Sequence, residues 1–498
     1  MTKKSLFFVF IIFIASYLFS QESSGVNVQE KNEKAELSLE KMLASYIAQD
    51  VRIQIATLQL QKTMLALKTS ENNASFNVEL STGTISVASD MFRAEPSITV
   101  SMPKLNGTQV QVNVPVLIKE IEEKSAFAGT TTSVKTEIFG NSSKNLSLSL
   151  QKSKRTLIES ERKLNQQVLN VEQEFYTQLK NLYNLYDLVL DSENELYEKK
   201  IDLETLKIQG YSEKSPKYRT VYLEILSCER NFNEKQRDLQ KALFLFFQKC
   251  DVKSEDINIE DLPAVKSVLK SSNIISTENN EEKINLLKNI VPMNLANYTE
   301  KEQAEWNLYI AQQEKKLNNF FSLDAEAGYI FQDSNSKGED SAKIALVANG
   351  FGGQISSGMS IPITGEKHIP SATFSLRWSP QDFSSQKNEN QQKELDIQVA
   401  MLNVLNAEES FENELDSLKN TWSDLIWSRN KNLEELEMYK TLARDMENWY
   451  GQGLISVSEN RKAQINLKNA ELQCKLNDID LILQYLKTKS LFVLDIEN

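Results

Sequence analysis

The chain has 498 residues, with 56 lysines and arginines against 69 aspartates and glutamates, so its formal net charge is −13. An acidic chain lacks the basic stripe that neutralises phosphates, which excludes a nucleic-acid-binding protein. With only 15 glycines, 9 prolines and one histidine, few turns and long helices are expected, and an enzyme is the least expected class.

The first twenty residues have the pattern of a secretory signal. Lys3 and Lys4 precede an apolar run from Leu6 to Phe19, and small or polar residues begin at Ser20. Because the run is shorter than the ~20 residues of a spanning helix, we expect cleavage near Ser20; an uncleaved membrane anchor is the alternative. No later apolar stretch approaches spanning length. A mature chain that enters a membrane must therefore do so as a closed β-barrel.

The rest of the chain is predicted to be two copies of one unit. Each copy consists of a helix, a block of strands, a very long helix, a glycine turn and a return helix, and Gly210 and Gly453 occupy the same place in the two copies. The predicted boundaries are 1–20 for the signal peptide, 21–73 for a linker and helix, 74–151 for strands with a hairpin, 152–255 for a helical hairpin, 256–319 for the second linker and helix, 320–380 for the second strands and hairpin, and 381–498 for the second helical hairpin.

The strand blocks alternate between apolar and polar residues. The apolar positions of the first block include Phe76, Val78 and Leu80 and a second segment at Leu146, Leu148 and Leu150; those of the second block begin at Leu323 and end at Trp378. This alternation is typical of barrel strands with lipid outside and water inside, and it predicts four interfacial aromatic residues: Tyr329, Phe331, Phe374 and Trp378. A soluble sheet packed on a core alternates in the same way. It is disfavoured because the adjoining helices carry a seam of their own, which leaves no evident cover for the sheet.

Each block also contains an extra hairpin around a turn signal, Asn106-Gly107 in the first and Asn349-Gly350 in the second. The sequence leaves open whether these middle hairpins are barrel strands or loops beyond the membrane. The run Gly350-Phe351-Gly352-Gly353 lacks the lysine of a phosphate loop, so a hairpin turn is predicted there.

The long helices have coiled-coil periodicity. Apolar residues recur every seven positions at Val168, Phe175, Leu182, Val189, Leu196 and Leu203, and again at Ile397, Val404, Phe411, Leu418 and Leu425. At 1.5 Å per residue the long helices reach roughly 90 to 100 Å and the flanking helices about 50 to 60 Å. Two short helices stacked end to end could therefore cover one long helix. The plainer alternative is an ordinary long coiled coil.

The second glycine turn carries the most recognisable motif, Trp449-Tyr450-Gly451-Gln452-Gly453-Leu454-Ile455-Ser456, and the first has Gly210-Tyr211-Ser212 with Ser215-Pro216. With the duplication, this motif resembles the TolC-like outer-membrane efflux proteins over nearly the whole mature sequence. The resemblance implies a mainly α fold with β, in which a homotrimer forms a coiled-coil α-helical barrel in the periplasm, joined to a transmembrane β-barrel shared by the subunits in the bacterial outer membrane.

The implied function is the exit duct of a tripartite efflux pump or type I secretion system. Its implied partners are outer-membrane lipid, a periplasmic adaptor (membrane fusion) protein, and an inner-membrane pump or ABC transporter. The turns that would dock on the adaptor are marked by Gly210, Ser215, Gly451, Gly453 and Ser456.

The resemblance also implies a periplasmic gate beside the second turn. Tyr450 and Glu459 match its tyrosine and first acid, whereas Lys462 stands at the second acid position. Ile455 replaces an arginine, and Pro216 replaces the acid of the first copy. The family's lock therefore does not carry over intact, and a solvated carboxylate on a helix face is the alternative for Glu459.

Other residues suggest no chemistry. His368 has no second histidine with which to share a metal, so no metal site and no cofactor are expected. The function alternative is an exported coiled-coil adhesin or structural protein without a pore. The sequence does not name a transported molecule.

Overall fold

The computed structural model describes residues 38–88, 91–119, 129–252, 293–318, 321–331, 339–364 and 369–493, together with residues 259, 262 and 265. The predicted signal peptide and His368 lie outside the described residues. Among the described helices, none is both long enough and apolar enough to cross a membrane.

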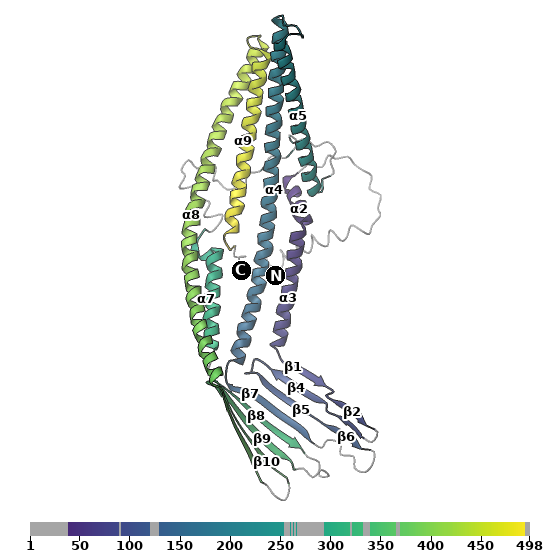
Figure 1. Ribbon diagram of the computed structural model, residues 1–498, viewed down its shortest axis with the longest axis vertical. Helices are drawn as coiled ribbons and strands as arrows, with labels where there is room; N and C mark the ends of the chain where they lie inside the picture. Colours follow the sequence, from purple (N-terminus) through teal and green to yellow (C-terminus); the bar gives the residue numbers. More distant parts are fainter. Residues whose placement is uncertain are drawn as a thin grey trace, which may run out of the picture. The chain divides into compact units, whose positions relative to one another are not determined.

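The described elements occur in the predicted order in both halves (Figure 1). The first repeat contains α2 (Leu39–Gln49), α3 (Val51–Asn73), β1 (Asn77–Ser81), β2 (Ile85–Ala88), β3 (Met91–Ala94), β4 (Ser97–Met102), β5 (Thr108–Asn113), β6 (Val116–Lys119), β7 (Thr130–Phe139), α4 (Ser142–Ile208) and α5 (Pro216–Lys249). The second contains the short 3-10 helix η5 (Leu295–Asn297), α7 (Thr299–Leu317), β8 (Phe321–Phe331), β9 (Ser341–Gly350), β10 (Gly353–Pro362), β11 (Ser371–Trp378), α8 (Pro380–Gly451) and α9 (Val457–Ser490). The predicted fold class, mainly α with a strand block in each repeat, is confirmed.

One predicted strand is wrong. Residues 142–151 form the first turns of α4 rather than a strand, so the strand block ends at Phe139. The leucines at 146 and 150 are four residues apart, which is also helical spacing, and the Glu137 carboxylate accepts a hydrogen bond from the Ser142 N–H at 2.8 Å, at the start of the helix. The first helix is also divided, because the Asp50 side chain caps α3 by accepting from the Arg52 N–H at 2.8 Å.

Eight strands form one antiparallel sheet in the order β1-β4-β5-β7-β8-β9-β10-β11. The two repeats meet where β7 pairs with β8, and β1 and β11 are the two edge strands. The middle hairpins β4-β5 and β9-β10 are paired between the outer strands as integral parts of this sheet.

In the second hairpin the turn is formed by Phe351 and Gly352, which both have positive φ, as a two-residue hairpin turn requires. The predicted turn signal Asn349-Gly350 is wrong by two residues, because both residues belong to β9. In the first hairpin five residues, 103–107, join β4 to β5, and the last two of them, Asn106 and Gly107, have positive φ.

The helices lie side by side in the same order as the strands to which they connect. Next to the sheet, α3 packs on α4, α4 contacts α7, and α7 packs on α8; farther away, α5 packs on α4, α4 on α9, and α9 on α8. Each long helix is therefore covered by shorter helices placed end to end, as the helix lengths predicted.

The same aromatic joint occurs where the shorter helices meet in each repeat. Phe175 of α4 contacts Tyr46 and Phe246, with ring centroids 5.5 and 5.3 Å away. In the second repeat, Phe411 of α8 contacts Tyr298 and Phe492 at 5.5 and 6.4 Å. Phe175 and Phe411 both belong to the predicted heptad stripes. Each stripe therefore provides the phenylalanine on which the ends of two shorter helices pack.

Candidate functional site

The two glycine turns have the same backbone geometry. Gly210 and Gly453 adopt φ of 84° and 73°, the left-handed conformation that ends a helix and favours glycine. The residue after each glycine donates a backbone hydrogen bond five residues back: Tyr211 to Leu206 at 3.1 Å, and Leu454 to Trp449 at 2.9 Å. This is the Schellman pattern of a helix C-terminus.

A serine then starts the next helix in each repeat. Ser215 Oγ accepts from the Tyr218 N–H at 3.2 Å, and Ser456 Oγ accepts from the Glu459 N–H at 3.2 Å. Ser215 and Ser456 are thus N-caps. The predicted docking residues therefore share a structural role in closing two equivalent helical hairpins.

Large apolar side chains are exposed at both tips. They are Ile208, Tyr211, Trp449, Tyr450, Leu454 and Val457, with Ile208 87% and Leu454 68% exposed. An added Cβ at Gly210, Gly451 or Gly453 would meet no atom within 4 Å. Open backbone flanked by uncovered apolar side chains is what a protein-docking surface offers.

Glu459 is engaged with its own helix. Its carboxylate Oε2 accepts from both the N–H and the hydroxyl of Ser456 at 2.8 Å, which completes a capping box. These hydrogen bonds to the Ser456 backbone and side chain lower the pKa of Glu459. Lys462 is exposed, and the carboxylate faces Ser456 instead of this lysine.

An ionic contact that the sequence reasoning missed lies close to the gate residues. Arg461 of α9 donates to Glu193 of α4 at 2.8 Å, and its guanidinium stacks 4.1 Å from the centroid of the Tyr197 ring. Farther along the same pair of helices, Lys180 donates to Asp480 at 2.5 Å. No local pattern marks these residues, because their partners are some 270 to 300 positions away.

A second ionic cluster joins the repeats near the sheet. Arg155 of α4 and Arg162 both donate to the carboxylate of Glu302 on α7, with Arg155 Nη2 at 2.7 Å and Arg162 Nη1 at 2.5 Å. Arg155 is only 7% exposed and also stacks on Trp306 at 5.2 Å. Burial raises the pKa of Glu302, but hydrogen bonds and charge from the two arginines outweigh it and hold the pKa at about 2.

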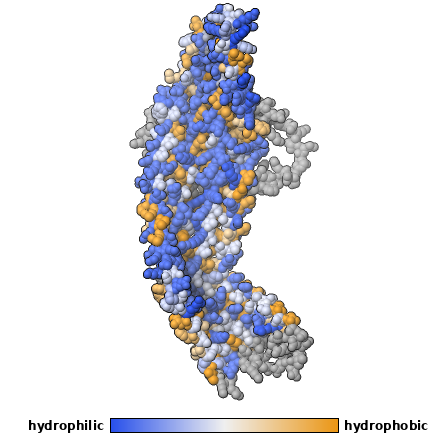
Figure 2. Space-filling view, viewed as in Figure 1, coloured by the Kyte–Doolittle hydropathy of each residue, from blue (hydrophilic) through white to orange (hydrophobic). Residues whose placement is uncertain are grey.

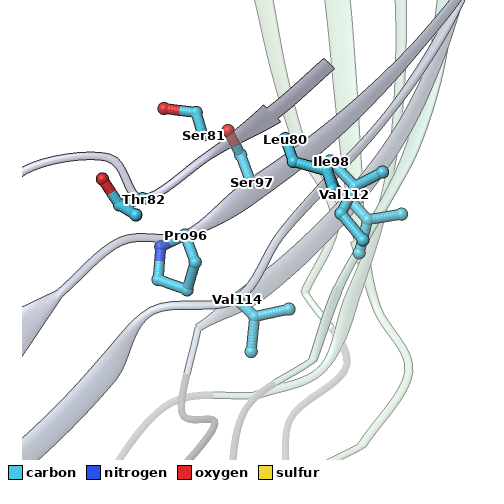
Figure 3. Close-up of a pocket in the computed structure, with 8 residues that line it drawn as sticks. All are labelled: Leu80, Ser81, Thr82, Pro96, Ser97, Ile98, Val112 and Val114. Atoms are coloured by element: carbon cyan, nitrogen blue, oxygen red, sulfur yellow. The ribbon is translucent and has the colours of Figure 1, made fainter. Parts of the chain in front are cut away.

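The register of the sheet gathers its apolar side chains on one face. Val78 and Leu80 pair with Val100 and Ile98, and the same face continues strand by strand through Val112, Val134, Ala327, Ile344, Met359 and Ala372. The opposite face carries mainly Ser, Thr, Asn, Gln and charged residues, with Ile330 and Val347 as apolar exceptions. Figure 3 shows Leu80, Ile98 and Val112 gathered on neighbouring strands, where with Pro96 and Val114 they line an apolar hollow of about 330 Å³.

The predicted interfacial aromatics lie on the apolar face at different heights. Trp378 pairs at the level of Gly353, next to the helices, and its indole N–H donates to the Phe351 carbonyl at 3.2 Å. Tyr329 and Phe331 lie at the far end of β8, and Phe374 is four residues from Trp378 in the middle of β11. Three further phenylalanines are exposed at the end of the sheet that lies next to the helices: Phe76, Phe139 and Phe321. The predicted set of interfacial aromatics did not include them.

Among the described residues, no group of histidine, cysteine, aspartate and glutamate side chains could hold a metal ion. The chain matches two family models in succession: the TP096X N-terminal domain over residues 42–271 and the TP096X C-terminal domain over residues 287–495. Together these ranges span well over half of the chain. The chain belongs to the TP096X family. The division between the two TP096X domains falls between the two repeats.

No curated protein sequence matches this TP096X chain. Among solved structures, it is similar to the outer-membrane channel OprN, at 11% identity over 95% of this chain and 97% of that chain, with a TM-score of 0.45. It is also similar to the outer membrane protein VceC from Vibrio cholerae, at 10% identity over 91% and 96% with a TM-score of 0.47, and to the CmeC outer membrane channel of Campylobacter jejuni, at 11% over 95% and 96% with a TM-score of 0.42. Each of these proteins is named an outer-membrane protein or channel.

Proposed function

We propose that this TP096X chain is a subunit of a homotrimeric outer-membrane channel, with its sheet in the membrane and its helical hairpins in the periplasm. The observation that carries the proposal is the mainly apolar face that crosses all eight strands. On that face Leu80, Phe374 and Leu376 are 74%, 71% and 65% exposed. A soluble sheet would bury such a face, because uncovered apolar area on this scale is unfavourable in water.

The height of the apolar face suits a bilayer. On β8 it extends from Phe321 to Phe331, which are ten residues apart, so it measures about 33 Å along the strand at ~3.3 Å per residue. At the strand tilt of about 40° that is usual in membrane barrels, this length rises about 25 Å. Membrane barrels have an outer apolar band about 25 Å tall. The polar face then lines an aqueous lumen.

The helical tips are proposed as the end that docks on a periplasmic adaptor, which connects the channel to an inner-membrane pump or ABC transporter. The support is the matched pair of open turns with exposed Ile208 and Leu454. Small molecules or polypeptides would leave through the duct. Tyr450, Glu459 and Lys462 are proposed as the gate, because they stand on the second of these turns and on the helix that follows it.

Opposite faces of β11 provide the test. Phe374→Arg places a charge on the apolar face, and Thr373→Arg places one on the polar face of the neighbouring position. A lipid-facing Arg near the bilayer midplane costs roughly 2–4 kcal/mol, whereas a lumen-facing one is tolerated.

The measurements are membrane fractionation, crosslinking in mild detergent, and conductance in planar bilayers. We expect the unsubstituted chain and Thr373→Arg to be found in the outer membrane as a species of about three chain masses that conducts. Phe374→Arg should be depleted from that fraction. A soluble monomer, or an adhesin-like protein without conductance, would refute the proposal.

A further inference from the structure

A second, smaller sheet lies beyond the eight-stranded one. Its three strands pair in the order β2-β3-β6. Each of them continues a strand of the first repeat, because β2 follows β1, β3 precedes β4 and β6 follows β5 (Figure 1). Three neighbouring strands are therefore interrupted at one level, and all three resume on the far side of the interruption.

Each interruption has a local cause. Gly83 has φ of 60°, and an added Cβ there would lie 1.8 Å from the Glu95 carbonyl oxygen. Pro96 and Pro115 interrupt the other two strands, because proline has no N–H to donate to a ladder. Pairing nevertheless continues at this level, where the Val114 N–H donates to the Pro96 carbonyl at 2.9 Å. The small sheet and the first repeat's part of the large sheet are thus one ribbon with a bend.

The small sheet has one apolar and one polar face. Residues that pair directly across strands share a face, and this register collects five apolar residues on one side: Ile85, Val87, Phe92, Ala94 and Val116. On the other side Ser86 pairs with Arg93, and Arg93 forms an ion pair with Glu95 at 2.5 Å. Ile85 and Val87 are 55% and 76% exposed. Hydrophobic surface is visible in Figure 2 at the place where Figure 1 shows β2.

The apolar faces of the two sheets lie on the same side of the ribbon. Ala94 is four residues from Ile98 of β4, and an even spacing keeps two side chains on one side of a strand. Between them, Pro96 lines the apolar hollow at the bend together with Ile98 and Val114 (Figure 3). The apolar face of the large sheet therefore continues through the bend.

A bulge keeps the same side in the edge strand. Four steps from Ser81 to Ile85 oppose three steps from Ser97 to Ala94, so the first strand contains one extra residue, and the left-handed glycine lies within it. Without the extra residue, Ile85 would lie on the polar side, because it is five positions from Leu80. The bulge is what a continuous apolar face requires.

The strands of the large sheet are staggered relative to the helices. Through its seven strand pairings, Asn77 at the start of β1 lies level with Thr373 of β11. Strand β11 continues beyond this level to Trp378 before α8 begins. Height in the wall must therefore be counted along each strand from the helix next to it.

Counted in this way, the small sheet belongs to the height of the second repeat's strands. Strand β8 begins at Phe321 and ends ten residues farther on, at Phe331. The same count from Asn77 leads to Val87, which is part of β2. Strand β1 by itself ends at Ser81, well short of that height.

The strand lengths lead to the same result. Strands β1, β4 and β5 have five or six residues, which at ~3.3 Å per residue and a tilt of about 40° rise about 13 Å, half of the ~25 Å apolar band of a membrane barrel. With the small sheet, the three strands become the twelve-residue runs 77–88, 91–102 and 108–119. Each run then rises about 28 Å, which is enough to span the band.

We infer that β2, β3 and β6 form the outer half of the membrane wall in the first repeat, and that their apolar face contacts the acyl chains of the leaflet farther from the helices. This inference rests on the proposed channel function and assigns a lipid partner to a surface that the eight-stranded sheet does not include. A wall that stopped at Ser81 would leave strand ends in hydrocarbon, where unpaired backbone groups are strongly unfavourable. The bend then lies about halfway through the membrane, and the face with Arg93 turns to the lumen.

Spin labels on single cysteines test this placement in the full chain, reconstituted in phosphatidylcholine vesicles. Val87→Cys probes the apolar face of β2, and Ser86→Cys, its neighbour on the polar face, is the matched control. Leu346→Cys marks the apolar face of the large sheet, where the side chain is 42% exposed. Electron paramagnetic resonance compares relaxation by oxygen, which concentrates among acyl chains, with relaxation by a water-soluble nickel chelate. The unsubstituted chain, treated in the same way, gives the background from its three cysteines.

At Val87 and Leu346 we expect oxygen to relax the label several-fold more than nickel does, and at Ser86 we expect the reverse. A label at Val87 that nickel relaxes more, while Leu346 stays in lipid, would overturn the inference and place the small sheet in water above a working channel. Protection of Val87 from both reagents would also overturn it, because a protein surface would then cover that face. Nickel access at Leu346 would instead refute the channel function itself.

Discussion

At the scale of single residues, the clearest electrostatic feature is Glu302, which holds two arginines at the contact between the repeats. Arg155 is buried, and a buried charge that loses its partner is strongly destabilising. The partner carboxylate is partly exposed, with 26% of its side chain accessible, so water reduces the effect. The cluster is therefore expected to stabilise the packing of α7 on α4 at neutral pH.

We predict that Glu302→Gln lowers the unfolding free energy by about 2 kcal/mol at pH 7. The pKa of Glu302 is about 2 in the folded chain against an ordinary value of 4.5. A lowered folded-state pKa gives stability that is present above pH 4.5 and is lost as the pH falls toward 2. Unfolding midpoints measured between pH 7 and pH 2 should show the wild type and the variant converging below pH 4.5.

The control for this prediction is Glu305→Gln on the same helix. Glu305 pairs with Lys301 at 3.6 Å and is largely exposed, so its loss should change the unfolding free energy by less than about 0.5 kcal/mol. Equal effects of the two variants, or a Glu302→Gln effect that does not depend on pH, would contradict the role assigned to the cluster.

At the scale of elements, the two repeats share two devices: the glycine turn at each tip and the aromatic joint at the middle of each long helix. Both arise from residues that recur in the two halves of the sequence. The turn joins antiparallel helices, and the joint fixes where two shorter helices meet on a long one.

The substitutions Gly210→Glu and Gly453→Glu are predicted to abolish efflux while the trimer still assembles. The positive φ of these residues would cost a side chain roughly 1–2 kcal/mol each, but the added atoms meet open space. Gly451→Ala is the control, because Gly451 is the last residue of α8 and a Cβ there also meets nothing within 4 Å. Efflux should be measured beside trimer crosslinking. Normal efflux in both glutamate variants would argue against docking at the tips.

Phe175→Ala should lower the unfolding free energy by about 3 kcal/mol or more, because Phe175 is completely buried between Tyr46 and Phe246. Phe244→Ala, two residues from Phe246 but 66% exposed, should cost less than about 0.5 kcal/mol. Chemical unfolding followed by circular dichroism compares the two. A similar loss in both variants would show that the joint is not what stabilises α4.

At the scale of the whole molecule, the proposed gate depends on three copies placed around one axis. Within one chain Glu459 is engaged by Ser456, so Lys462 can pair with an acid of another copy. A ring of three Glu459 carboxylates would attract cations, and three Lys462 side chains would partly neutralise it.

Lys462→Asp is predicted to make the aperture strongly acidic and to increase block by divalent cations, whereas Glu459→Gln should weaken cation selectivity. Ser456→Ala provides a control, because it removes the helix cap but keeps the charge of Glu459. Single-channel recordings should show altered selectivity in the first two variants only. If neither changes selectivity or block, these residues do not line the constriction.

The sequence by itself determined the features that depend on near neighbours. Apolar residues at every seventh position predicted the long helices, apolar–polar alternation predicted the strand faces, and Gly210 and Gly453 predicted the turns. Each of these patterns reflects backbone geometry within a few residues. The same local reasoning was wrong at Leu146–Leu150, because the leucines at 146 and 150 also have the spacing of one helix face. It also passed over the capping box Ser456-x-x-Glu459, which is readable from sequence alone.

Only the tertiary structure decided which distant elements meet. It placed β7 beside β8, inserted the middle hairpins into one eight-stranded sheet, and brought Glu302 to Arg155 and Arg461 to Glu193. The β7–β8 pairing and the two ion pairs join residues over a hundred positions apart, and they depend on how whole faces fit together. The periodicity of the sequence does not encode that fit. It shows which face of a helix or strand must be buried, but it does not show which other element buries that face.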